Sequence, residues 1–407
     1  MATPPTKHED LIKHITLETL SGETIEYGKD NDIGSFKYIE DMNLGFPIIE
    51  LTVPEAAFIN LNKRIQGSEI IKVKNVKWNK FQLKNEEFRI KAMGIATPIM
   101  NKMGNMNYIK FIAHHINQEK LMNFDKSVYS GDTKIISDLV KKTYEAANIR
   151  LNLNVESTEP LPKLGWWNLF IPYSYDAMKV IRKMSHYAMS TAGRGGYLYY
   201  HNKEAMHFKS MAKVMGDKKP DERIDIFEGA NDYIMRNISF SPFNDLQTMS
   251  MGNVKSCIGY NFQDKKMLRY DWNSMELSYP MTDRMLQVKS TNADKCLKPY
   301  YTPCDDPKWM KAFAESMYVS QMFNVNLELN MEVTKTRVGR SNNWKVGDVI
   351  EIVFKNSTPA QEKYYNMSGW WLIKTSIFAF SDSSVTQSLK LVKAGMKPPH
   401  KGDYTPA

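Results

Sequence analysis

The chain has 407 residues, with 54 lysines and arginines against 45 aspartates and glutamates, which gives a formal net charge of +9. Its 42% hydrophobic and 24% charged residues are typical of a globular protein and exclude a disordered chain. No apolar stretch approaches the length that a membrane-spanning helix needs, so we expect no membrane span. The length predicts two to four domains.

The cysteines and the N-terminal residues indicate the cellular compartment in which the protein is made. There are three cysteines, and no CxxC pair occurs among them. An odd count without paired spacing argues against both a disulfide framework and a zinc cage, and it favours a reducing compartment. Residues 1–6 lack a basic start followed by an apolar run, which predicts that there is no signal peptide.

The remaining composition favours a protein with broad packed faces. Aromatic residues make up 12% of the chain, including 21 tyrosines and 8 tryptophans, and there are 26 methionines. Such residues fill β-sheet faces or subunit contacts. The positive charge raises a nucleic-acid hypothesis, but the lysines are spread along the chain without a block of five like charges. Solvated faces explain them equally well.

Short alternating strands fill the first part of the chain. The turn Ser21-Gly22 predicts a tight hairpin, and Pro54 opens a short predicted helix over residues 54–63. Short strands separated by turn residues predict a small barrel or sandwich. The expected strands are residues 15–20, 23–27, 36–38, 48–52, 69–74, 87–95 and 108–114.

The middle of the chain changes to helical periodicity. Asp132 is the expected cap of a first helix, and a second helix is predicted over residues 174–190. Gly193-Arg194-Gly195-Gly196 ends that helix in our prediction, and an aromatic hairpin follows over residues 197–209. Polar residues 211–225 predict a loop or linker.

The last part returns to strands after one more helix. Asp306 and Pro307 predict a helix start in the expected cap and first-turn order, and residues 272–305 are expected to be irregular. The class is therefore α+β, with β dominant. The expected strands are residues 233–240, 252–262, 325–333, 349–354, 370–380 and 385–392.

A search for catalytic patterns assigns no catalytic, cofactor-binding or metal-binding residue. The glycine-rich run at residues 193–196 closes a predicted helix and precedes a strand, which is the reverse of a phosphate-binding loop and favours a C-terminal cap and turn. His114 and His115 are adjacent on a strand and therefore point to opposite faces. No HExxH, GxSxG or Walker-type motif occurs.

Two further kinds of residue pair are explained by structural roles and not by catalysis or ligand binding. The acidic pairs Glu86-Glu87 and Asp305-Asp306 are expected at solvated turns or a helix cap. Trp166-Trp167 and Trp370-Trp371 could stack on sugars or bases, but in an alternating strand at least one of Trp370 and Trp371 should face a core. We therefore predict that the chain is not an enzyme and needs no cofactor.

Several local patterns together resemble the baseplate hub, or tail hub, proteins of contractile-tailed bacteriophages and related injection systems. The most specific is Val346-Gly347-Asp348-Val349 followed by Ser368-Gly369-Trp370-Trp371-Leu372-Ile373 and a final hairpin. The other stretches that resemble this family are residues 54–69, 167–209, 252–270 and the helix after Asp306.

This resemblance implies a fold of two small antiparallel β-barrel (tube-like) domains with α+β insertions. Three copies would form a trimeric, pseudo-sixfold ring, and such a ring can meet a hexameric tube on one side and a trimeric spike on the other. The implied segments are 1–125 (first barrel), 126–210 (α+β insertion), 211–262 (start of the second barrel), 263–322 (irregular and helical insertion), 323–395 (remainder of the second barrel) and 396–407 (C-terminal tail).

The partners implied by the resemblance are the tail tube protein, the central spike protein and other baseplate proteins. DNA would pass through the channel without specific binding, and the location would be the virion, after assembly in the host cytoplasm. Two alternatives stay open. A basic, aromatic-rich nucleic-acid-binding protein predicts salt-sensitive binding, and a carbohydrate-directed enzyme would rest on the tryptophan pairs and carboxylates alone.

Overall fold

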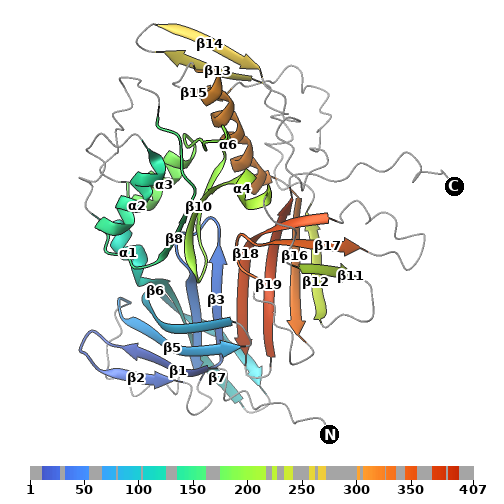
Figure 1. The fold of residues 1–407 in the computed structure, drawn as a ribbon. Helices are drawn as coiled ribbons and strands as arrows, with labels where there is room; N and C mark the ends of the chain where they lie inside the picture. The colour runs from blue at the N-terminus through green and yellow to red at the C-terminus, as the bar shows by residue number, and fades with distance from the viewer. Residues whose placement is uncertain are drawn as a thin grey trace, which may run out of the picture.

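The structure is a computed structural model in which one large, mostly antiparallel sheet is flanked by helices gathered along one side (Figure 1). The class predicted from the sequence, α+β with β dominant, is confirmed. The structure describes residues 12–27, 33–54, 67–78, 81–101, 104–124, 135–161, 175–216, 222–226, 233–241, 256–261, 265–271, 300–302, 306–325, 327–335, 344–354, 369–381 and 384–393.

The large sheet has thirteen strands, and its main path runs β12-β16-β19-β18-β3-β4-β7-β6-β5-β1-β2. Strands from the N-terminal part are β1 (Ile12–Glu18), β2 (Thr24–Tyr27), β3 (Ser35–Asp41), β4 (Ile48–Pro54), β5 (Ile70–Trp78), β6 (Phe81–Asn101) and β7 (Gly104–His115). Strands from the C-terminal part are β11 (Glu222–Ile226), β12 (Tyr233–Ser241), β16 (Leu327–Lys335), β17 (Val349–Phe354), β18 (Gly369–Ser381) and β19 (Ser384–Lys393).

Strand β18 joins the two parts of the sheet. One of its edges pairs with β19, whereas the other is shared, with residues 369–372 pairing with β17 and residues 375–381 pairing with β3. The resemblance implied two small barrel-like domains, and the described strands of these two parts are joined edge to edge. Along the described strands the two parts form one continuous sheet whose order does not close, because a strand of 13 residues is long enough to serve two partners.

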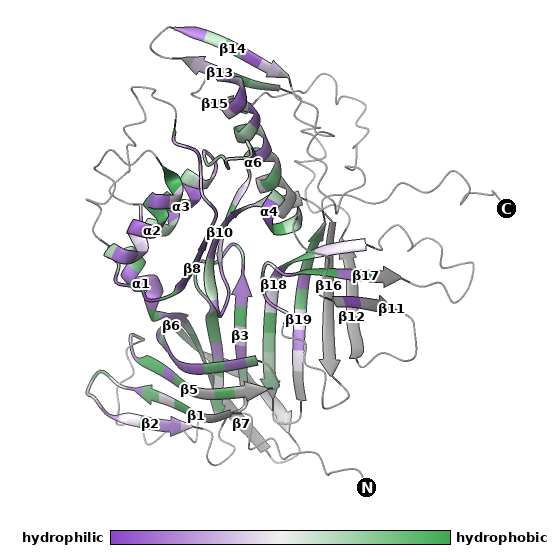
Figure 2. Cartoon of the chain, viewed as in Figure 1, coloured by the Kyte–Doolittle hydropathy of each residue, from purple (hydrophilic) through white to green (hydrophobic). Residues whose placement is uncertain are grey.

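The sheet's inner face forms a core that crosses this join. Strands β3 and β4 alternate between half-buried and buried residues along their whole length, as the pleat of a one-sided sheet requires. The Phe81 ring lies 4.2 Å from that of Phe378 in β18, and the Phe36 and Phe380 centroids are 5.8 Å apart. Aromatic side chains from both parts of the chain therefore stabilise one core. In Figure 2 hydrophobic residues appear as green segments along strands of both parts.

A helical layer lies beside the N-terminal strands. It contains α1 (Ile116–Met122), α2 (Ile136–Ala146), α3 (Ala177–Ser185), α4 (Met211–Gly216) and a three-stranded sheet of β8 (Asn152–Val155), β10 (Ala205–Ser210) and β9 (Tyr197–His201). The predicted aromatic hairpin is confirmed as β9 and β10.

Three local predictions in this layer are wrong. Helix α2 begins after Ile135, which makes no side-chain cap, and Asp132 lies outside the described residues. Helix α3 ends at Ser185, before the predicted residue 190; the chain then makes a turn in which the Tyr187 and Ala188 amides donate to carbonyls three residues back, and Ser190 forms an isolated bridge with Thr158. Residues 211–225, expected to be a loop, contain α4 and β11, which pairs in parallel with β17.

A last helix, α6 (Pro307–Val325), begins where predicted, with the Asp306 carboxylate accepting a 2.8 Å hydrogen bond from the Lys308 amide. Its buried residues include Trp309, Met310, Phe313 and Ala314, so the helix is covered on more than one face. At one end α6 contacts a small sheet of β14 (Lys266–Asp271), β13 (Ser256–Asn261) and β15 (Tyr300–Thr302). Strand β15 lies in the segment that was expected to be irregular.

Some predictions concern residues outside the described ranges. The predicted helix over residues 54–63 is one of them, since only Pro54, the last residue of β4, is described. Trp166-Trp167 and Asp305 also lie outside the described ranges. Cys257 is described, and its side chain is buried.

Candidate functional site

One buried carboxylate lies where the sheet, the helical layer and the C-terminal part of the chain meet. Glu40 is on the inner face of β3, after Phe36 and Tyr38 in the same alternation, and it is 2% exposed. A carboxylate at such a position is costly unless its oxygens are hydrogen-bonded. Glu40 is therefore the first residue whose partners need explanation.

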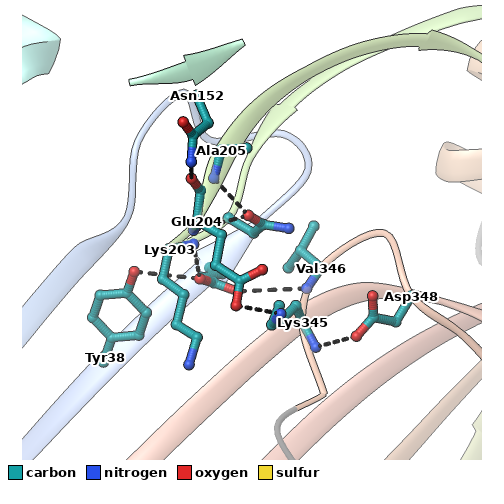
Figure 3. Close-up of polar contacts among 10 residues, drawn as sticks. Tyr38, Asn152, Lys203, Glu204, Ala205, Lys345, Val346 and Asp348 are labelled. Atoms are coloured by element: carbon teal, nitrogen blue, oxygen red, sulfur yellow. Dashed lines mark hydrogen bonds and ion pairs between the residues drawn. The ribbon is translucent and has the colours of Figure 1, made fainter. Parts of the chain in front are cut away.

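Three donors, two of them distant in sequence, supply those hydrogen bonds. The Lys203 amide, in the turn between β9 and β10, donates to Oε1 at 2.6 Å, and the Val346 amide, before β17, donates to Oε2 at 3.4 Å. The Tyr38 hydroxyl donates to Oε1 at 3.3 Å. We call these four residues the Glu40 junction. Its two distant donors lie 163 and 306 residues away, so it connects three parts of the chain (Figure 3).

Charged side chains around the junction hold the same two loops together. The Lys345 ammonium is 2.5 Å from the Glu204 carboxylate, which links the loop before β17 to the β9–β10 turn. The Lys345 amide also donates to Asp348 at 2.9 Å, which closes its own loop. The Lys203 ammonium lies 4.9 Å from the centroid of the Phe81 ring, in the sheet core. Figure 3 shows Lys203, Glu204, Lys345 and Asp348 close together, on loops that come from different parts of the chain.

A glycine allows the loop before β17 to approach this closely. Gly347 has φ +91°, and a Cβ at this position would lie 2.2 Å from the Tyr200 hydroxyl of β9. Tyr200 in turn stacks on His207 of β10, with ring centroids 4.7 Å apart. The Val346-Gly347-Asp348 sequence is thus required by packing against the helical layer, since no larger residue fits there.

Burial dominates the electrostatics of the junction. It raises the pKa of Glu40 to about 7, although the two backbone amides stabilise the ionised form. Burial also lowers the pKa of Lys203 to about 8, against the opposing effect of Glu40. Because Lys203, Val346 and Tyr38 all donate to Glu40, this carboxylate positions backbone rather than facing a substrate. Its chemistry is that of a structural connection between loops.

The glycine-rich loop at residues 193–196 makes a second connection, to α6. Arg194 donates to Glu315 Oε1 through Nε and Nη2 at 3.0 and 2.7 Å, and the Gly195 amide donates to Oε2 at 2.8 Å. The Glu315 side chain is fully buried, so solvent does not stabilise its charge. The Arg194 guanidinium and the Gly195 amide supply part of the compensation that a buried carboxylate needs. The predicted turn is confirmed, but it does not cap a helix, because α3 ends at Ser185 with His186 as its C-cap.

The structure separates the residues that the sequence search considered. His114 bonds Gln118 at 3.0 Å, whereas His115 bonds Glu86 at 2.9 Å. Glu86 and Glu87 lie inside β6 and not at a turn, because β6 extends over 21 residues. Trp371 is fully buried and Trp370 is partly buried, which confirms that one of the pair faces a core.

Within the described ranges, no three histidine, cysteine, aspartate or glutamate side chains group closely enough to hold a metal ion. In the same part of the chain, no helix combines the length and apolar character needed to cross a membrane. Glu40 and Glu315 were not among the candidates from the sequence. The signal for Glu40 was available, since extending the Phe36 and Tyr38 alternation by two residues places a carboxylate in the core.

Two buried histidines beside the junction predict sensitivity to acid. Burial, more than neighbouring positive charge, lowers the pKa of His201 to about 3 and that of His207 to about 4. The unfolded chain binds these protons below its ordinary pKa of 6.5, whereas the folded chain does not until pH 4 to 3. Stability is therefore fully present above pH 6.5 and falls below it, by up to about 2.7 kcal/mol per pH unit for two protons.

The measurement is the thermal unfolding midpoint at pH 7.5, 5.5 and 4.5. We expect His207→Phe, which keeps an aromatic ring against Tyr200, to remove about half of the part of this dependence that the two histidines cause. The opposite contribution of Glu40 is present in both chains and leaves the difference between them unchanged. An unchanged slope in this variant would show that other groups cause the acid sensitivity.

The architecture described above can be compared with those of known proteins. Neither the family models nor the curated proteins contain a match to the sequence. Solved structures do, and the resemblance to the tail hub proteins predicted from the sequence is confirmed at the level of the fold.

Two of these structures match almost the whole chain. A tail protein from Neisseria meningitidis MC58 has a TM-score of 0.56 at 8% identity, with 93% of this chain and 96% of that one covered. The 43 kDa tail protein of prophage MuSo2 from Shewanella oneidensis also has a TM-score of 0.56, at 9% identity, with 94% and 98% covered.

Proposed function

We propose that the chain is the structural hub of a contractile tail, acting without catalysis. The observation that carries this proposal is the full-length likeness to two tail proteins, in which about the same share of both chains is covered. A likeness over one domain would be compatible with many functions, because folds are reused. A likeness over all layers, including the helical one, favours a shared architectural role.

In this proposal three copies form a pseudo-sixfold ring that joins the hexameric tail tube to the trimeric central spike. Segment 1–125 supplies one tube-like unit, and segments 211–262 and 323–395 supply the other. Other baseplate proteins contact the ring from outside, and DNA passes through its channel without specific binding. The ring is built in the host cytoplasm and resides in the virion.

The continuous sheet supports such a role mechanically. Strand β18 pairs with β3 over residues 375–381, so the two tube-like units of one chain are held in register by main-chain hydrogen bonds. The Glu40 junction then connects the helical layer to β3 and to the loop before β17, and the Arg194–Glu315 connection joins it to α6. A subunit that must present two similar surfaces at a fixed spacing needs this rigidity.

The test of the trimer is the mass of the full-length chain in solution. We expect native mass spectrometry to give three times the 47.0 kDa of one chain, at a protein concentration of about 10 µM. The reason is that a ring subunit leaves its contacts exposed when it is unpaired. A monomer at every concentration, and absence of the chain from purified tail particles, would contradict the proposal.

A further inference from the structure

The small sheet at the end of α6 carries a strand that is unusually open. Strand β14 is the edge of the order β14-β13-β15, and it lies at the outer limit of the molecule, beyond the end of α6 (Figure 1). Lys265, in the turn before β14, and residues 266–269 of β14 are all exposed, although strand neighbours point to opposite faces. Both faces of β14 therefore meet solvent along this stretch, and two of the exposed residues are large and apolar.

The register with β13 shows what each face presents. Cys257 pairs with Tyr270 and Gly259 with Leu268, so these residues share the face that packs toward α6. Tyr260 pairs with Met267 on the opposite, outer face, and Met267 is 68% exposed. The outer face thus places the Met267 thioether beside the half-buried ring of Tyr260. Methionine side chains adapt their shape to those of a binding partner.

Charge adds the second part of the argument. Of the five exposed residues, three are cations, Lys265, Lys266 and Arg269, and none is acidic. Lysine on an edge strand discourages pairing with identical copies of that strand, since two such edges would bring like charges together. The same lysines favour pairing with a strand that carries carboxylates.

The main chain of β14 supplies the third part. Among the described strands β14 pairs only with β13, so no described strand pairs with its other edge. An extended peptide can add to such an edge by main-chain hydrogen bonds, with alternate side chains lying on one face. Met267 and Tyr260 would then receive the apolar side chains, and the lysines the acidic ones.

We propose that β14 is a docking strand for an extended acidic segment of another protein, which adds to the sheet with its apolar side chains on the Met267 face. Nucleic acid fits less well, because three cations beside a large exposed apolar side chain and an open strand edge match a peptide backbone better than a row of phosphates. This inference does not require the trimeric ring, so the two can fail separately.

The test uses the full-length chain and fluorescent eight-residue peptides that alternate valine with glutamate or valine with lysine. We expect fluorescence anisotropy to show that the glutamate peptide binds at least tenfold more tightly than the lysine peptide. Charge reversal at Lys265→Glu and Lys266→Glu should weaken it at least tenfold, and Met267→Thr should weaken it several-fold. The matched control is Lys141→Glu with Lys142→Glu, an exposed basic pair on α2, which should leave binding unchanged.

Two further arms decide between mechanisms. N-methylation of alternate peptide residues removes main-chain donors, and methylation on the pairing side should abolish binding, whereas an electrostatic contact alone would tolerate it. Equal binding by methylated and unmodified peptides would overturn the proposal, as would preferential, steeply salt-dependent binding of a 20-nucleotide DNA strand. Each variant's thermal midpoint should match that of the wild-type chain, because all three positions are exposed.

Discussion

Replacing Gly195 with alanine should detach the glycine-rich loop from α6 and destabilise the chain by at least about 3 kcal/mol. A Cβ at this position would lie 1.9 Å from the carbonyl oxygen of Ala312, which is main chain and cannot rotate away. Any shift that relieves the overlap also lengthens the hydrogen bond from the Gly195 amide to Glu315. The buried carboxylate then loses part of its compensation.

The measurement is the urea midpoint of Gly195→Ala compared with Gly94→Ala. Gly94 is an exposed position in β6 where an added Cβ would meet no atom within 4 Å, so its substitution should change stability by less than about 0.5 kcal/mol. Equal midpoints for the two variants would show that α6 does not rest on this loop.

Removing the carboxylate of Glu40 is expected to have the second large effect. Glu40→Ala leaves the part-buried amide of Lys203 and the buried amide of Val346 without their acceptor, and each unsatisfied buried donor costs about 1–3 kcal/mol. We therefore expect a loss of about 3 kcal/mol or more, together with faster proteolysis of the β9–β10 turn as it separates from the sheet.

A matched pair of variants isolates this effect. Glu40→Gln keeps the volume and one acceptor, so its midpoint should lie between those of the wild type and Glu40→Ala. Glu18→Ala removes a carboxylate that contacts Lys72 at the surface, and it should cost less than about 1 kcal/mol. If Glu18→Ala and Glu40→Ala proved equally mild, the junction would not hold these segments together.

The pKa of Glu40 gives this prediction a pH dependence. Its folded pKa of about 7 lies above the ordinary value of 4.5, so its contribution to stability is fully present below pH 4.5 and is lost as pH rises through 7. The opposite sign applies to the two buried histidines. Glu40→Gln cannot ionise, and the midpoint difference between it and the wild type should therefore shrink between pH 6 and pH 8.

Periodic patterns predicted the strands well where one face of the sheet is buried. In β19, where residues 385–392 were predicted to form a strand, residues 386–391 alternate between half-buried and buried, with Gln387, Leu389 and Leu391 all buried. Gln387 is tolerated there because its amide donates to the Trp344 carbonyl at 2.8 Å and to the Ser376 hydroxyl at 2.9 Å. In such strands the alternation of apolar and polar residues in the sequence matches the alternation of buried and exposed side chains, so the strand can be predicted from the sequence.

Features that depend on distant partners could not be predicted in this way. Residues 222–226 have a polar composition, and they form a strand because β17 supplies a parallel partner from much later in the chain. Ser190, which was expected in the helix of α3, instead forms a bridge with Thr158. The role of Glu40 depends on two loops that only the folded chain brings to it. Such long-range terms override local propensity.

The central claim is that copies of this chain assemble into a ring. Its most direct test is electron microscopy of the purified full-length chain, followed by two-dimensional averaging of end-on views. We predict rings with threefold or pseudo-sixfold symmetry and an open centre. If the averages contained only single, asymmetric particles when the sample is prepared at about 10 µM protein, the claim would be contradicted.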